Sequence, residues 1–302
     1  MPALATEPSD TRGLSQRRLP ALILVAALAG SGLLRNMIDH QAPAVPEFNP
    51  LVYVTSGETL RRLSLGYEGL LADIYWTRVV QYFGRERLAG NGQFDSLGPL
   101  LRVATTLDPH LLIAYRFGAV FLAEKPPAGA GRPEEALALI RRGVAANPSY
   151  WRLWQDLGFI YYWDLKDYTH AALAFEAGSR QPGADLWMKT LAASVAAQGG
   201  ELETSRLLWS EVYRVGGNES IRRSAAEHLA AIEAAMEIEQ LDRALILFQQ
   251  RTGRPAASFN ELYQAGLLAG EPVDPTNVPY ALGKDGRAAL GPDSKIDLNL
   301  AR

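Results

Sequence analysis

The chain of 302 residues contains no cysteine. This absence excludes disulfide bonds, thiolate metal ligands and cysteine nucleophiles, and it leaves the redox compartment open. Basic residues are in no excess either, because 30 lysines and arginines are balanced by 33 aspartates and glutamates, for a formal net charge of −3. No basic stripe stands out along the chain, so we expect no nucleic-acid partner.

Recognisable catalytic motifs are missing as well. No H-E-x-x-H pair would hold zinc on a helix face, and the histidines are isolated from one another: His40, His110, His170 and His228. The sequence has no G-x-S-x-G nucleophile elbow and no phosphate-binding G-x-x-x-x-G-K-S/T loop. We therefore expect no catalytic residue, no metal, no cofactor and no small-molecule substrate.

The N-terminal region has the pattern of a targeting segment. Three arginines, Arg12, Arg17 and Arg18, precede an uncharged apolar run at 19–34. As a helix this run reaches only roughly 24 Å, against a hydrocarbon core of roughly 30 Å, but Arg35 can snorkel and the apolar surface extends to residue 38. The pattern favours a cytoplasmic N-terminus at 1–18 and a transmembrane anchor at 19–38.

A cleaved signal peptide is the alternative interpretation of the same segment. Ala27-Leu28-Ala29 before Gly30 has the small-x-small form of a cleavage site. Under both interpretations the arginines stay in the cytoplasm, and the chain that follows a linker at 39–56 is exported. We expect a single-pass protein of the inner membrane with its bulk in the periplasm.

A spacing of four, three and five residues recurs in the middle of the chain. It occurs three times, the last time with its final interval shortened by one: at Leu97, Leu101, Ala104 and Pro109, at Ala136, Ile140, Gly143 and Pro148, and at Ala171, Phe175, Gly178 and Pro182. Intervals of four and three place side chains on one helix face, and proline ends a helix because it lacks an amide donor. The pattern therefore predicts equivalent helices in a repeat architecture.

Another helix is expected before each of these segments. The best-defined one carries Trp154, Leu157, Gly158 and Tyr161, and it is followed by Ala171, Phe175 and Pro182. These residues resemble the tetratricopeptide repeat, whose pattern is W-x2-L-G-x2-Y followed by alanine, an aromatic residue, alanine and proline. The unit departs from the pattern by a one-residue insertion between its helices and by Gly178 in place of alanine. In the preceding unit, we expect Gly118 to occupy the position that corresponds to Gly158.

The resemblance implies an all-α fold, a TPR-like α-solenoid of helix pairs with three to four units at 57–217. Each unit buries its apolar face only by stacking, so the ends of the stack need capping, and we expect a capping helix at 218–251. The residues expected to pack the repeats are Trp154, Leu157, Gly158, Tyr161, Ala171, Phe175, Pro182, Gly118, Ala136 and Pro148.

The segment 252–302 carries a second set of motifs in a fixed order. They are G-R-P at 253–255, S-F-x-x-L at 258–262, G-L-L at 266–268, P-x-D-P at 272–275, P-Y at 279–280 and D-G at 285–286. This order resembles the C-terminal region of type II secretion pseudopilins, without the tryptophan-glycine that usually follows the aspartate-proline. It implies a small α+β or loop-rich pilin-like module.

In a tetratricopeptide solenoid the first helix of each unit lines a concave groove. The resemblance therefore implies that a protein or peptide partner is bound by Arg152, Gln155, Phe159, Tyr162 and Trp163, with Tyr115 one unit earlier and Lys189 one unit later. Aromatic residues and arginine dominate binding hot spots because they bury large areas at low entropic cost. The alternative is that the chain itself covers the three aromatic rings.

These patterns together predict a membrane-anchored scaffold that binds partner proteins in an envelope assembly, such as a secretion or pilus-like apparatus. Two alternatives remain open. One is an exported soluble peptide-binding protein, released by signal cleavage near Gly30. The other is an envelope enzyme that uses the solenoid only for docking.

Overall fold

The computed structural model describes residues 27–34, 37, 56–90 and 92–302. The chain divides into two units, 1–53 and 54–302, which are treated separately. In the first unit, residues 27–34 are helical; the predicted cytoplasmic segment 1–18, most of the predicted anchor 19–38 and nearly all of the linker 39–56 lie outside the described residues. Among the described residues, no helix combines the length and the apolar character that crossing a membrane requires.

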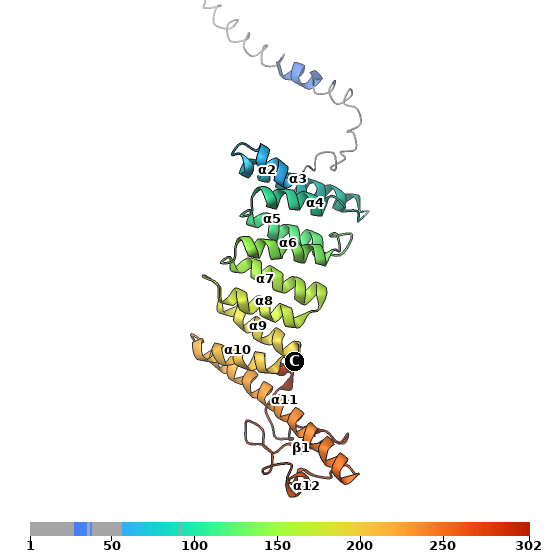
Figure 1. The fold of residues 1–302 in the computed structure, drawn as a ribbon, viewed down its shortest axis with the longest axis vertical. Coiled ribbons are helices and arrows are strands. Elements are labelled where there is room, and N and C mark those ends of the chain that lie inside the picture. The colour runs from blue at the N-terminus through green and yellow to red at the C-terminus, as the bar shows by residue number, and fades with distance from the viewer. Residues whose placement is uncertain (1–26, 35–36, 38–55, 91) are drawn as a thin grey trace, which may run out of the picture. The chain divides into compact units, whose positions relative to one another are not determined.

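From residue 57 to residue 252 the second unit consists of consecutive helices (Figure 1). In chain order they are α2 Gly57–Leu63, α3 Glu68–Ala89, α4 Leu97–Leu107, α5 Leu112–Ala123, α6 Pro133–Ala146, α7 Trp151–Phe159 with its π-helical extension η2 Ile160–Leu165, α8 Tyr168–Ser179, α9 Leu186–Gln198, α10 Leu202–Val215 and α11 Glu219–Thr252. Within the described part of this unit, the expectation of an all-α architecture up to residue 252 is confirmed.

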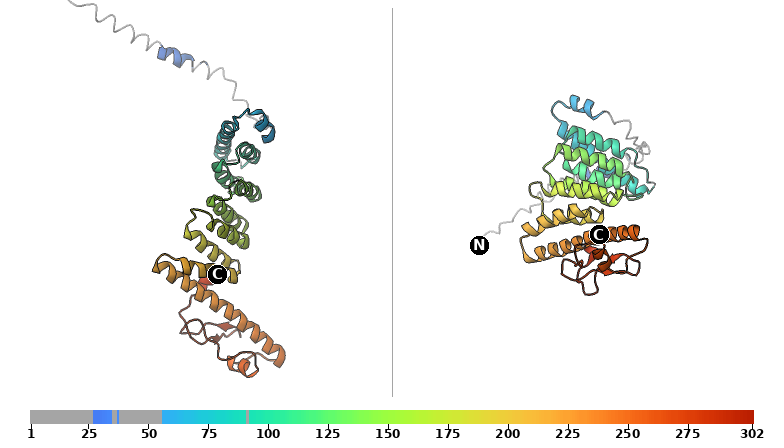
Figure 2. Two further views of the ribbon diagram at one scale, coloured as in Figure 1. Left: turned by 60° about the vertical axis from the view of Figure 1, so that its left-hand side comes forward. Right: turned by 60° about the horizontal axis from the view of Figure 1, so that its bottom comes forward.

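Neighbouring helices pack in pairs, and the pairs stack. The first helices α3, α5, α7 and α9 pack against the second helices α4, α6, α8 and α10 that follow them, and each second helix packs against the next first helix. The same order along the stack is visible from the two further directions of Figure 2. One core cluster runs through the whole stack, from Ala72 in α3 to Ile232 in α11.

Glycine makes the close crossings of the stack possible. A Cβ atom on Gly158 of α7 would lie 2.6 Å from Cδ1 of Phe175 in α8, and one on Gly178 of α8 would lie 2.7 Å from Cβ of Trp154. One unit earlier, a Cβ on Gly143 of α6 would lie 2.8 Å from the ring of Tyr115. Distances this short exclude any side chain, so glycine at these places sets how closely paired helices approach.

The one-residue insertion of the best-defined unit is absorbed at the end of its first helix. After Phe159 the chain changes to the π-helical turn η2, which ends at Lys166 with a positive φ of 56°. A π turn accommodates one residue more than an α turn, so the following helix keeps its place. Asp167 then begins α8 by accepting a hydrogen bond from the backbone N–H of His170 at 3.0 Å.

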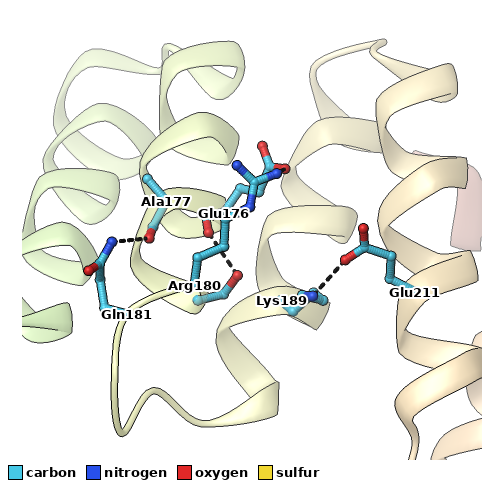
Figure 3. A network of polar contacts seen from close by, with 7 residues as sticks. Glu176, Ala177, Arg180, Gln181, Lys189 and Glu211 are labelled. Carbon is cyan, nitrogen blue, oxygen red and sulfur yellow. Dashed lines mark hydrogen bonds and ion pairs between the residues drawn. The ribbon is translucent and has the colours of Figure 1, made fainter. Parts of the chain in front are cut away.

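Helix α10 is joined to α9 by an ion pair and to α11 by packing. The carboxylate of Glu211 in α10 accepts a hydrogen bond from Nζ of Lys189 in α9 at 2.6 Å (Figure 3). The following helix, α11, begins at Asn218, whose side chain caps it by accepting from the N–H of Ile221. Its first half packs on α10, where the rings of Trp209 and His228 stack at 3.9 Å.

The second half of α11 supports the residues 253–302, called the C-terminal module below. A separate core cluster joins Leu241, Leu245 and Phe248 of α11 to residues of this module. The module contains α12 Phe259–Gln264, the antiparallel strands β1 Ala281–Leu282 and β2 Ala288–Ala289, and the 3-10 helix η3 Leu298–Ala301. The long helix α11 is thus followed by a short helix and a two-stranded hairpin.

The C-terminal module is not detached from the stack. Helix η3 returns to pack against α9 and α11, and Ala301, only 6% exposed, belongs to the core cluster of the stack. Residues 54–302 consequently form one unit, and the domain boundaries expected at 217/218 and 251/252 fall inside it. Helix α11 ends at Thr252, within one residue of the second of these boundaries.

A buried aspartate organises the central turn of the C-terminal module. Asp274 is 2% exposed, and one of its oxygens accepts hydrogen bonds from the N–H groups of Thr276 and Val278 at 2.8 and 3.0 Å, while the other accepts from the hydroxyl of Ser294. Burial raises the pKa of Asp274, but the hydrogen bonds from Ser294, Val278 and Thr276 outweigh it, so the pKa lies below its usual value.

We expect Asp274→Ala to destabilise the chain by about 1 kcal/mol, because two backbone donors of the turn lose their acceptor. Since the folded-state pKa is depressed, the charge of Asp274 contributes stability above the usual aspartate pKa of about 4, and that contribution is lost as the pH falls through the folded value. Denaturant titrations at pH 7 and below pH 4 check this. Asp274→Asn, which keeps an acceptor oxygen, should lack the acid-dependent part; an unchanged acid dependence would assign it to other groups.

Candidate partner-binding surface

The predicted groove residues of α7 and η2 differ in how open they are. Trp163 is 58% exposed, and its ring stacks on that of Phe159 with the centroids 4.4 Å apart and an interplanar angle of 7°. Arg152 is exposed and lies 4.3 Å above the ring of Trp151, while Gln155 is half-buried. The Phe159–Trp163 pair therefore forms an aromatic shelf on the surface.

Tyr162 is covered by the chain to a greater extent. Its half-buried ring meets that of Tyr168 edge-on at 5.4 Å, and Phe159 meets the buried ring of Phe175 edge-on at 5.1 Å. The alternative in which the chain covers its own aromatics thus applies to Tyr162 and partly to Phe159. Trp163 remains the open ring.

Tyr115 is not a groove residue. Its side chain is 2% exposed, packs over Gly143, and has its hydroxyl 3.4 Å from the carbonyl oxygen of Thr105. Burial raises its pKa. Trp154 packs over Gly178 in the same way, so Tyr115 corresponds to Trp154. The alignment of this unit that placed Gly118 at the position of Gly158 was therefore wrong by one residue.

The corrected register places other side chains of α5 on the surface. Ile113, Phe117 and Val120 are 44%, 52% and 54% exposed, and their spacing of four and three puts them on one helix face. On α3, Val80 is 43% exposed and follows the buried Val79, as Val120 follows the buried Ala119 on α5. These four residues, together with Phe159 and Trp163, are called the first-helix surface below.

An ion pair joins two of the helices that carry this surface. Nε of Arg116 in α5 donates to a carboxylate oxygen of Asp156 in α7 at 2.6 Å, and both side chains are partly buried. Burial raises the pKa of Asp156 although Arg116 opposes the shift. The hydrogen bond to Asp156 in turn raises the pKa of Arg116, which stays charged. This pair fixes α5 against α7.

Lys189 is engaged with the second helix of its own unit. Its ammonium binds Glu211 of α10 and lowers the pKa of that carboxyl group (Figure 3). The neighbouring surface carries a further pair, Arg180 with Glu176 of α8. Lys189 therefore supports the end of the stack, and its charge is already neutralised.

The first-helix surface ends at α9. There the places equivalent to Phe159, Tyr162 and Trp163 are taken by Ala193, Ala196 and Ala197, which are at most 4% exposed. Helix η3 packs on α9 at this end of the stack. The C-terminal segment thus closes the layer of first helices where no further unit follows.

The predicted packing residues lie mostly in the core. Those with little or no exposed surface are Leu157, Gly158, Tyr161, Ala171, Phe175, Gly118 and Ala136. Trp154 is half-buried, and its Nε1 donates to the carbonyl oxygen of Pro148 at 2.8 Å, which ties the start of α7 to the preceding turn. Pro182 is exposed in the turn after α8.

A hollow of about 680 Å³ opens in the C-terminal module. Phe259, Tyr263 and Tyr280 line it together with Glu271. The hydroxyl of Tyr280 donates to Glu237 of α11 at 2.6 Å, and burial followed by this contact raises the pKa of Tyr280. That phenol is therefore already engaged within the chain.

Comparison with known proteins adds no assignment. The sequence matches no protein-family model and no curated protein. Within the described residues, no cluster of histidine, aspartate and glutamate is arranged to hold a metal ion. The geometry thus defines a stacked-helix protein whose first helices expose an apolar and aromatic surface.

Proposed function

We propose that this chain is a membrane-anchored tetratricopeptide-type scaffold of the cell envelope, which binds a protein partner on its first-helix surface. The repeat assignment is supported by the W-x2-L-G-x2-Y match at 154–161 and by the paired helices with glycine crossings at Gly118, Gly143, Gly158 and Gly178. The membrane anchor is supported by the apolar run at 19–34, and a role in a secretion or pilus-like assembly by the order of motifs at 252–302.

The single observation that carries the proposal is the exposure of large apolar side chains on adjacent first helices. Phe117, Val120 and Trp163 each leave about half of their surface in solvent, and they lie on the successive first helices α5 and α7 with its extension η2. An apolar patch that folding leaves uncovered typically marks an interaction site. Trp163 is also of the residue type most enriched in binding hot spots.

The surface indicates the chemistry of the partner segment. Its rings and aliphatic side chains fit an apolar segment, as in an amphipathic helix or an extended strand. The Arg116–Asp156 pair lies between α5 and α7 and offers polar groups of both signs. A partner with leucine or aromatic anchors and few net charges satisfies both features.

The alternatives are separated by simple observations. A freely exported binding protein would have a mature N-terminus near Gly30, whereas the anchored scaffold keeps its first residues. An envelope enzyme would retain an activity in variants that no longer bind the partner.

We expect Phe117→Ser/Trp163→Ser to lose partner binding while the fold persists, because both side chains are more than half exposed. Loss of one hot-spot anchor costs about 2 kcal/mol, which corresponds to a roughly 30-fold weaker affinity. Affinity capture from crosslinked envelopes, with circular dichroism on the purified variants, checks this. Leu173→Ser on α8, where the leucine is 51% exposed, is the matched control on a second helix.

A further inference from the structure

The turn between α2 and α3 presents large apolar side chains to solvent. Leu63, Leu65 and Tyr67 are 69%, 88% and 68% exposed. Leu70 and Ile74 continue the patch along α3 at 59% and 40%. This is the densest group of exposed large apolar residues in the described chain, and it lies at the opposite end of the stack from α10 (Figure 1).

The turn is built to hold these side chains outward. Ser64 is buried, and its single hydroxyl proton is shared between two acceptors, the carbonyl oxygen of Arg61 at 2.7 Å and the carboxylate of Glu68 at 3.1 Å. The next residue, Leu65, has a φ of 51°, in the left-handed region that bulky residues rarely adopt. Leu65 thus adopts a strained backbone conformation although its side chain contributes almost no buried surface to the fold. Such strain indicates that the residue serves a function other than stabilising the fold.

Two cations accompany the apolar tip. Arg61 and Arg62 are exposed on the last turn of α2, and within the described part of the chain neither has an ion-pair partner. The acidic groups of the same elements are Glu58 at the start of α2, Glu68, which is bonded to Ser64, Asp73 further along α3, and Glu86 at its far end, which pairs with Arg85. The arginines next to the leucines are thus free to meet an anionic surface.

We infer that the α2–α3 tip docks on the surface of a lipid bilayer, with Leu63, Leu65 and Tyr67 in the interface and Arg61 and Arg62 at anionic headgroups. Leucine and tyrosine flanked by arginine are the residues that peripheral membrane segments use, with tyrosine at headgroup level. A protruding tip also suits a deformable bilayer better than a protein partner, which would need a matching hollow. The inference does not rest on the partner-binding surface.

The position of the tip in the chain agrees with docking on a lipid bilayer. The predicted anchor ends at residue 38, and the linker 39–56 that follows spans at most roughly 60 Å when fully extended. The tip is the first part of the second unit that the chain reaches. Docking would therefore set the orientation of the stack above the membrane.

The absence of cysteine makes a site-specific test possible. The full-length Leu65→Cys variant is labelled with an environment-sensitive fluorophore and reconstituted in phosphatidylcholine bilayers with or without phosphatidylglycerol. We expect a shift of the emission to shorter wavelength and protection from an aqueous quencher, both increasing with phosphatidylglycerol and both lost in Arg61→Gln/Arg62→Gln. Leu173→Cys on α8 is the control that should stay accessible throughout.

Two results would overturn the inference. If the label at residue 65 is as accessible as that at residue 173 in every bilayer, the tip does not meet lipid. If it is protected to the same extent whatever the lipid composition and in the arginine variant, a protein surface covers it, either from this chain or from a second copy. Neither readout depends on partner binding, so failure here leaves the proposed scaffold role to its own test.

Discussion

Gly158→Leu is expected to lower the free energy of unfolding by about 3 kcal/mol, the upper end of the usual range for overpacking a core. A Cβ at this position would already lie 2.6 Å from Cδ1 of Phe175, whose ring is fully buried and meets the ring of Phe159 edge-on. The ring therefore has no free space into which it could move. Because residues 54–302 form one unit, the loss should appear as one cooperative transition at lower denaturant concentration.

Gly217→Ala is the matched control for this substitution. Gly217 lies in the turn before α11, and no atom comes within 4 Å of a Cβ placed there. Its variant should unfold within about 0.5 kcal/mol of the parent chain. Equal unfolding midpoints for Gly158→Leu and Gly217→Ala would mean that α7 and α8 do not cross at Gly158.

Deletion of residues 296–302 is expected to destabilise the stack by about 2 to 4 kcal/mol. The segment contributes buried Ala301 and the partly buried Ile296 and Leu300 to the core cluster of the stack. Full burial of a large aliphatic side chain stabilises the fold by about 1.5 to 3 kcal/mol, from which the entropic cost of ordering the segment is subtracted. Its removal would also uncover the part of α9 on which η3 packs. The measurement is thermal unfolding followed by circular dichroism.

A separate C-terminal module would give the opposite result. In that case the truncated chain would keep the unfolding midpoint of the parent. A conservative check is Ala301→Ser, which places a hydroxyl in the apolar site and should cost a fraction of the deletion. A deletion that leaves stability unchanged would show that η3 does not close the end of the stack in solution.

The sequence predicted the helix pairs because their pattern depends on local features. The spacing of Ala171, Phe175 and Gly178 follows directly from helix geometry, and the turn prolines end the helices for a local reason. The insertion before Ala171 was also visible. That it would become a π turn and not a longer loop depends on packing, which spacing alone does not report.

The candidate surface was predicted less well, for a physical reason. Gly118 and Ala119 are adjacent small residues, so two registers of α5 are compatible with a close helix crossing. Only the packing of Tyr115 over Gly143 selects between them, and that contact joins residues 28 positions apart. The exposed spacing of Ile113, Phe117 and Val120 was the available signal, but apolar residues at helical spacing more often indicate a core face.

The remaining differences between the expectations from the sequence and the structure come from long-range contacts. Lys189 was expected to face a partner, but Glu211 of α10 neutralises it. The return of η3 to α9 joins the two ends of a segment more than a hundred residues long, and no local pattern could indicate it. Such contacts are set by the whole fold.

The most direct test of the proposed scaffold is the ratio of partner recovered with Phe117→Ser/Trp163→Ser to partner recovered with Leu173→Ser, from crosslinked native envelopes at equal bait. The proposal predicts a specific set of proteins that is recovered with the control and the parent chain but falls roughly 30-fold or to background with the surface variant. Equal recovery with both variants, at unchanged helicity, would contradict partner binding on the first-helix surface.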